Sequence, residues 1–90
     1  MRFEWNALKA AANLRNHGVS FDEAASVFFY LLSATGHDPD HSLDERRFVT
    51  FGMSSSGRLL VVAHAQQEDA IRIITARHAT RAERKLYEEG

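Results

Sequence analysis

Residues 71–77, Ile71-Arg72-Ile73-Ile74-Thr75-Ala76-Arg77, are the stretch that decides the fold of this 90-residue chain. The β-branched residues favour a strand, and the basic segment that follows favours a helix. Side chains alternate along a strand, so Ile71 and Ile73 point to one face of a sheet, while Arg72 shares the other face with Ile74. The first face is expected to pack against helices. On the second face, the guanidinium group suits either a phosphate or a pairing with a nearby glutamate.

Two more strands are expected directly before this one. Residues 47–53 alternate between polar and apolar side chains, and residues 58–65 form an almost continuous apolar run. The serines and glycine at 54–57 and the polar residues at 66–69 indicate turns between the strands. Connections this short favour antiparallel neighbours, so the three strands are predicted to form a β-meander.

The N-terminal part is expected to supply a short strand and a helix. Residues 2–5 alternate between polar and aromatic side chains, which is typical of a strand. Asn6 can then cap a helix over residues 7–17, because its side chain can accept hydrogen bonds from free amides of the first turn. Gly18 can take the left-handed conformation that ends such a helix.

A second and a third helix are also predicted. Ser20 and Glu23 have the spacing of a capping box and open a helix that runs to about Leu31. Residues 33–44 are polar and predict a loop, which a short strand can precede. Thr80 can cap a closing helix. The predicted fold is therefore α+β, with helices packed on one sheet.

Composition predicts a small cytoplasmic protein with one domain over residues 1–90. The net charge is −1, which is not that of a protein that coats nucleic acid nonspecifically. The charges are uneven, however, because residues 20–45 contain no lysine or arginine, whereas the charged residues of 72–85 are all basic except Glu83. The chain has no cysteine, which excludes disulfides and cysteine-based metal sites. Without a long apolar run, neither a membrane span nor a signal peptide is expected.

Short motifs run in order along the whole chain, from Phe3-Glu4-Trp5 through Asn13-Leu14-Arg15-Asn16-His17-Gly18, Asp38-Pro39-Asp40-His41-Ser42 and Gly57-Arg58-Leu59-Leu60-Val61-Val62 to residues 71–77. The ordered set resembles the BrnT toxins of bacterial type II toxin–antitoxin pairs. The resemblance implies a RelE-like α+β fold: a short N-terminal strand, two helices, an antiparallel meander of three or more strands and a C-terminal helix. It also implies RNA cleavage that inhibits translation, and a hetero-oligomer with a cognate DNA-binding antitoxin similar to BrnA.

Four positions depart from the usual pattern of that family, which commonly has Asp, Glu, Thr and Arg in the places of Asn6, Arg46, Ala65 and Gln67. Asparagine caps a helix as well as aspartate does, so the first change is expected to matter little. If the arginine replaced by Gln67 helps to bind RNA, its loss weakens the toxin. An alternative function is therefore a weak or inactive binding module that serves as antitoxin partner and corepressor. A plain α+β adaptor is a third interpretation.

A ribonuclease that uses no metal needs a base for the ribose hydroxyl, cationic donors for the phosphorane and an acid for the leaving oxygen. Arg72 and Arg77 are predicted to stabilise the phosphate, and His64 to carry the proton. His64 shares a strand face with Leu60 and Val62, so a structural role at the end of an apolar row is equally open. No cofactor is expected.

Three basic residues are predicted to bind RNA, namely Lys9, Arg58 and Arg81, and Arg47 is a further candidate for a contact with the RNA backbone. A solvated surface position is the plainer interpretation of Lys9 and Arg81. The segment His37-Asp38-Pro39-Asp40-His41 contains side chains of types that bind metals, but its spacing matches no standard site and it equally makes a turn. No metal site is expected there.

Overall fold

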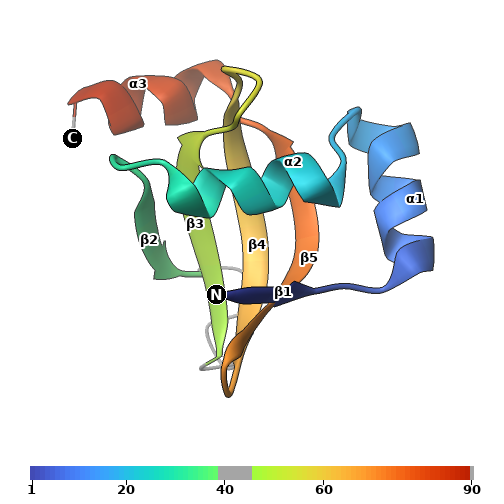
Figure 1. Cartoon of the computed structure of the whole chain (residues 1–90). Helices are drawn as coiled ribbons and strands as arrows, with labels where there is room; N and C mark the ends of the chain where they lie inside the picture. Colours follow the sequence, from blue (N-terminus) through green and yellow to red (C-terminus); the bar gives the residue numbers. More distant parts are fainter. Residues whose placement is uncertain (39–45, 90) are drawn as a thin grey trace.

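The computed structural model describes residues 1–38 and 46–89 (Figure 1). The elements follow in the order β1 (Arg2–Glu4), α1 (Ala7–His17), α2 (Phe21–Ser26), the 3₁₀ turn η1 (Val27–Phe29), β2 (Ala34–His37), β3 (Arg47–Met53), β4 (Leu59–Gln67), β5 (Ala70–His78) and α3 (Arg81–Glu89). The strands form a sheet in the order β1-β5-β4-β3-β2. This arrangement confirms the predicted α+β class and the meander β3-β4-β5, whose neighbours are antiparallel.

The two edge strands are the part of the sheet that local sequence did not settle. β1 pairs with β5 in parallel, so the first and the last strand of the chain make the sheet mixed rather than purely antiparallel. The short strand that the sequence allows before the loop is present as β2. It comprises residues 34–37, which lie within the stretch expected to be a loop. The hydroxyl groups of Thr35 and Thr50 lie 2.7 Å apart across the β2–β3 pair. Cross-strand pairing therefore outweighs the weak strand propensity of the glycine and histidine in β2.

Helix α1 begins and ends where the sequence predicts. The Asn6 side chain accepts hydrogen bonds from the amides of Leu8 and Lys9 at 2.9 and 3.0 Å. Gly18 has φ of +69° and its amide donates to the carbonyl of Leu14, which closes the helix in the left-handed conformation. Both ends are thus fixed by local hydrogen bonds.

Helix α2 begins as predicted but the expectation that it runs to about Leu31 is wrong. The Ser20 hydroxyl accepts from the amide of Glu23 at 3.0 Å, as in a capping box. The α-helix ends at Ser26, tightens into η1, and Tyr30 is already extended. The Ser26 hydroxyl donates to the carbonyl of Glu23 at 2.6 Å and accepts from a turn amide beyond β3, so it anchors the end of the helix to that turn.

The core lies between the sheet and helices α1 and α2, which cover one sheet face (Figure 1). Asn13 is a buried polar residue where α1 meets the sheet, with 5% of its surface exposed. Its amide nitrogen donates to the carbonyls of Val19 and Ala76, at 2.9 and 2.8 Å, and its oxygen accepts from the amide of Ala76 at 3.1 Å. The side chain is therefore satisfied and ties α1 to β5. Apolar residues fill the rest of the cluster: Val19, Phe21, Ala24, Val27, Leu60, Val62, Ile73 and Ala76.

A bulge in β5 changes which face its last residues occupy. Ala63 pairs with Thr75, but the next residue, His64, pairs with Ile73, so Ile74 is the extra residue on β5. In a regular strand, side chains five positions apart point to opposite faces. The bulge reverses this alternation and brings Arg72 and Arg77 to the same face.

Candidate functional site

The sheet face opposite α1 and α2 is the open face, and its side chains form three rows across β3, β4 and β5. The register of the strands gives the rows as Phe51, Val61 and Arg77; then Val49, Ala63 and Thr75; then Arg47, Ala65 and Arg72. The middle of the open face is therefore apolar, and arginines stand in the rows on either side of it. The row of Arg72 continues onto β1, where Glu4 is its partner in register.

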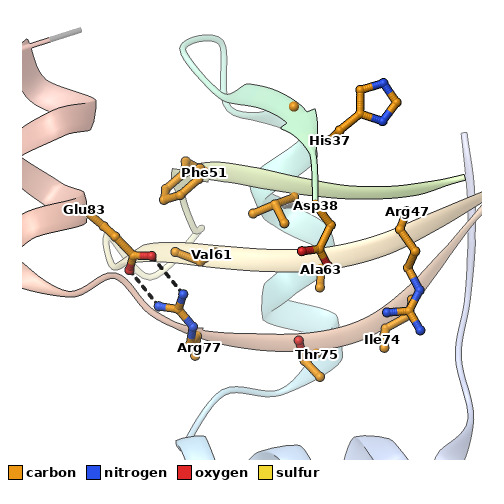
Figure 2. A pocket seen from close by; sticks show the side chains of 12 residues that line it. His37, Asp38, Arg47, Phe51, Val61, Ala63, Ile74, Thr75, Arg77 and Glu83 are labelled. Atoms are coloured by element: carbon orange, nitrogen blue, oxygen red, sulfur yellow. Dashed lines mark hydrogen bonds and ion pairs between the residues drawn. The ribbon is translucent and has the colours of Figure 1, made fainter. Parts of the chain in front are cut away.

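A hollow of about 370 Å³ lies on this open face. Figure 2 shows Arg77 and Glu83 at one end of the hollow and Arg47 toward the other, with Val61 and Ala63 between them. Strands β2, β3, β4 and β5 and the first turn of α3 all contribute to its lining. The hollow thus combines an apolar floor with the charged groups of Arg77, Glu83 and Arg47 at its ends and the carboxylate of Asp38 beside Ala63 (Figure 2), as ligand sites commonly combine apolar and polar groups.

Arg77 and Glu83 form a two-pronged ion pair at the end of the hollow. The two guanidinium nitrogens Nη1 and Nη2 donate to the carboxylate oxygens at 2.7 and 2.9 Å. Glu83 also accepts from the amide of Thr80 at 2.9 Å, while the Thr80 hydroxyl accepts from the amide of Glu83 at 3.1 Å. This reciprocal pair is a capping box at the start of α3. The carboxylate is therefore fixed by the helix and holds the guanidinium group over the sheet.

Hydrogen bonds from Arg77 lower the pKa of Glu83 to about 2, and the Thr80 amide adds to the effect. Glu83 is thus ionised at neutral pH. Its side chain is 25% exposed and that of Arg77 is 41% exposed, so both groups remain accessible to a solute. An anion that takes over the donors of Arg77 would remove the main cause of the low pKa and make Glu83 a stronger base.

Arg72 has a looser partner. Its Nη1 lies 3.9 Å from a carboxylate oxygen of Glu4, beyond hydrogen-bond distance, and the two side chains are 40% and 36% exposed. An exposed pair at this distance holds its members weakly. Arg72 therefore keeps most of its capacity to bind an incoming anion from the same face as Arg77.

His64 lies on the other face of the sheet, in the core beside Phe28 and Phe48. Only 4% of its surface is exposed, and its Nε2 is 2.7 Å from the Thr50 hydroxyl. Burial lowers the pKa of His64 to about 4, so the imidazole is neutral at pH 7. The structure does not bring His64 together with Arg72 and Arg77. This buried environment suits the alternative considered from the sequence, a structural role for His64 at the end of an apolar row.

The predicted RNA-binding residues occupy three different environments. Arg58 donates to both carboxylate oxygens of Glu23 and, at 3.1 Å, to the carbonyl of Gly18. These contacts join the start of β4 to α2 and use the donors of the guanidinium group within the fold. Lys9 is exposed on α1, the helix that packs on the far side of the sheet from the hollow. Arg81 is exposed in the first turn of α3, two residues before Glu83. Of the three, Arg81 is thus the one that belongs to an element, α3, from which a residue lines the hollow.

Two residues of the hollow, Glu83 and Phe51, are not among the sequence-predicted site residues. A signal for Glu83 was present, because it lies three residues after Thr80 and so completes a capping-box pattern. That pattern predicts a helix start and says nothing of Arg77. Phe51 was expected as a strand residue, but alternation alone did not tell which sheet face would be left open.

Arg46 and Gln67, two of the positions that depart from the family pattern, both line a second hollow of about 370 Å³. Glu4, the partner of Arg72, also lines it. Gln67 is exposed at the end of β4. The position where the resemblance leads one to expect an arginine is thus on the surface and close to the row of Arg72.

Pro39, Asp40 and His41 of the possible metal segment lie outside the described residues. Within residues 1–38 and 46–89, no group of three or more His, Asp or Glu side chains is arranged to hold a metal ion. In the same part of the chain, every helix is too short or too polar to cross a membrane.

Comparison with known proteins adds two findings to this geometry. The family model described as "Ribonuclease toxin, BrnT, of type II toxin-antitoxin system" matches residues 5–83. The crystal structure of the Brucella abortus ribonuclease toxin BrnT superposes with a TM-score of 0.70 at 20% sequence identity, covering 90% of this chain and 99% of that one. Among curated protein sequences, none matches significantly. The structural match confirms the fold expected from the resemblance.

Proposed function

Because the chain belongs to the BrnT family of ribonuclease toxins of type II toxin–antitoxin systems, we propose that it is a metal-independent endoribonuclease whose active site is the open face of the sheet. RNA cleavage there would inhibit translation. Membership of a type II toxin–antitoxin family implies an antitoxin partner. We propose that this partner is a DNA-binding protein similar to BrnA, which forms a hetero-oligomer with the toxin.

The observation that carries this proposal is the ion pair of Arg77 and Glu83 at the edge of the hollow. It supplies a fixed, accessible guanidinium group and, beside it, an ionised carboxylate. Arg72 lies on the same face, five positions along β5. Two guanidinium groups on one side of a sheet suit the charge of a phosphodiester, and more so that of a phosphorane.

The chemistry that follows uses these side chains in sequence. Arg77 binds the scissile phosphate, and its release from Glu83 raises the pKa of that carboxylate. Glu83 then takes the proton of the ribose 2′-hydroxyl while the 2′-oxygen attacks phosphorus. Arg77 and Arg72 stabilise the phosphorane, the bond to the 5′-oxygen breaks, and that oxygen takes a proton from water. The hydroxide left behind takes the proton held by Glu83, which restores the carboxylate. The products are a 2′,3′-cyclic phosphate and a 5′-hydroxyl end.

Glu83 replaces His64 as the proton acceptor in this proposal, because His64 is buried on the opposite face of the sheet. A group must reach within hydrogen-bond distance of the proton it removes. Glu83 lines the hollow and is hydrogen-bonded to the arginine that would bind the phosphate. The two roles therefore fall on adjacent side chains.

The test is expression in bacteria with incorporation of labelled amino acids followed over time, together with cleavage of RNA by purified protein in excess EDTA. Wild type is expected to stop incorporation and to cleave RNA with EDTA present, whereas R77A does neither. R15A is the matched control, since Arg15 is exposed on α1 and its loss changes the net charge equally. Cleavage that disappears in EDTA would exclude metal independence.

The alternative function, an inactive partner and corepressor, rests on Gln67 and Arg46. It predicts that wild type binds its antitoxin but leaves both RNA and amino-acid incorporation unchanged. Restoring the usual family residue with Q67R would then be expected to produce cleavage. A wild-type protein that already cleaves RNA at the rate of Q67R would contradict this alternative.

A further inference from the structure

We infer that the hollow on the open face receives one unpaired RNA base, so that the enzyme acts on single-stranded RNA and not on duplex RNA. This inference rests on the proposed function and names its substrate class. Its basis is the composition of the floor, the placement of the charges around it, and its size.

The floor of the hollow has the character of a surface for stacking. Phe51 supplies an aromatic ring that is half-buried, and Val61, which is 6% exposed, lies next to it in register on β4. Val49, Ala63 and Ile74 continue the apolar lining. An aromatic ring among apolar side chains can stack on the face of any base, and such stacking is insensitive to sequence.

The charges lie where the backbone of a nucleotide would run. Arg77 is at one end of the hollow and Arg47 toward the other (Figure 2). Each can bind a phosphate, so the two together suit the phosphates that flank a seated base. Thr75, an exposed residue, lines the hollow between these ends, and its hydroxyl can hydrogen-bond to a base edge. Arginines around an apolar floor distinguish this face from a purely apolar surface that would suit a protein partner.

The volume of about 370 Å³ is near the lower end for ligand pockets, which suits one nucleotide rather than a helix. In a duplex, the faces of the bases are stacked on one another and cannot reach an apolar floor. Single strands, loops and ends can turn a base outward. A duplex would therefore meet only the arginines, while a single strand also gains the contact with Phe51.

Binding can be measured separately from cleavage with RNA that carries 2′-O-methyl groups, because these block the attacking hydroxyl. The probe is such an oligonucleotide with one 2-aminopurine, used alone and annealed to its complement. Wild type is expected to bind the single strand at least about tenfold more tightly than the duplex, with a change in 2-aminopurine emission, in line with one base stacked on an aromatic ring.

F51A is expected to lose that preference and the emission change while binding the duplex as before. F51L, which keeps most of the volume, guards against loss of folding, and should keep part of the preference. F29A is the control, because Phe29 is 69% exposed and belongs to η1, outside the hollow. Equal affinity of wild type for both RNAs, or an unchanged preference in a folded F51A, would overturn the inference.

Two further results separate this inference from other interpretations. If F51A weakens binding of the purified antitoxin and leaves RNA binding unchanged, the floor is a protein-docking surface and the inference is wrong. If unmodified RNA stays uncleaved while the methylated single strand shows the preference and its loss in F51A, the base site stands and the proposed catalytic function fails.

Discussion

Arg77 of β5 and Glu83 of α3 are joined by two hydrogen bonds, of 2.7 and 2.9 Å, that fasten the last helix to the open face of the sheet. The bulge at Ile74 makes this pairing possible on that face, because without it Arg77 would point toward the core. The same carboxylate caps α3 through Thr80. One side chain thus sets both the start of a helix and the orientation of an arginine.

The first prediction concerns Glu83 as the base. E83Q keeps an oxygen that can accept from Thr80 and from Arg77, and glutamine is accepted at this position of a capping box, so the fold should persist. It removes the ability to take a proton at neutral pH. RNA cleavage is expected to fall by about 10²- to 10⁴-fold, the usual size of a general-base effect, as measured by the rate of cleavage of a labelled RNA.

E89Q is the control for E83Q, because Glu89 is exposed in the same helix and its loss changes the charge equally. Its cleavage rate should equal that of wild type. The role of Glu83 as base is refuted if E83Q, folded and binding RNA normally, cleaves as fast as E89Q. In that case the carboxylate only orients Arg77.

The second prediction assigns a structural role to Arg58. Hydrogen bonds from Arg58 lower the pKa of Glu23, and the Ser54 hydroxyl also donates to that carboxylate at 2.6 Å. R58M removes the charge and leaves the half-buried carboxylate without its main partner, so the melting temperature should fall by several degrees. Its binding of RNA, measured below the melting transition, should match that of wild type. A normal melting temperature together with weak RNA binding would return Arg58 to the RNA site.

Much of this fold follows from local sequence. Helix ends can be predicted at Asn6, Gly18 and Thr80, because the capping hydrogen bonds of these residues lie within one turn of the chain. The alternation of residues 71–73 likewise gives the correct faces for Ile71, Arg72 and Ile73. These features depend on neighbours in the chain, which a sequence displays directly.

The rest depends on contacts between distant segments. The bulge at Ile74 arises in the pairing of β5 with β4, and no glycine or proline marks it. Consequently the shared face of Arg72 and Arg77 could not be read from their spacing. The ion pair of Arg58 is equally hidden, because its partner Glu23 lies 35 positions away. The partner of Arg77 is only six positions away, but the pairing depends on the bulge that puts Arg77 on the open face. Two arginines that look alike in sequence therefore have different surroundings: Arg58 holds parts of the fold together, and Arg77 forms a partly exposed ion pair at the hollow.

The third prediction is a loss of stability in acid caused by His64. Burial lowers its pKa in the fold to about 4, while the unfolded chain has the ordinary value of 6.5. Between pH 4 and pH 6.5, His64 is protonated in the unfolded chain and neutral in the folded chain. The free energy of unfolding therefore has its full value above pH 6.5. It falls by about 3 kcal/mol in total as the pH drops toward 4. Urea unfolding at a series of pH values measures it.

H64L removes the titrating group and keeps an apolar side chain beside Phe28 and Phe48. The Thr50 hydroxyl still has that of Thr35 as a partner. The variant should show a smaller fall in the free energy of unfolding between pH 6.5 and 4 than wild type, even if it is less stable at pH 7. Parallel pH curves for the two proteins would mean that His64 is already protonated in the fold or that its burial carries no penalty.

The last prediction concerns the close approach of η1 to β3. A Cβ atom at Gly52 would lie 2.8 Å from Cγ1 of Val27 and 3.0 Å from Cβ of Ser33, so G52A forces η1 and the turn after it away from the sheet. Overpacking of this kind costs about 1–3 kcal/mol in the free energy of unfolding. Urea unfolding at pH 7 measures the loss.

Gly36 gives the matched control, because a Cβ atom there meets nothing within 4 Å. G36A should be neutral or slightly stabilising, since alanine loses less conformational freedom on folding than glycine. V27A leaves space for the new methyl group, so G52A and V27A together should destabilise by less than the sum of the two single changes. Strict additivity would show that the clash with Val27 is not what destabilises G52A, and that the contact with Ser33 is the source of the strain.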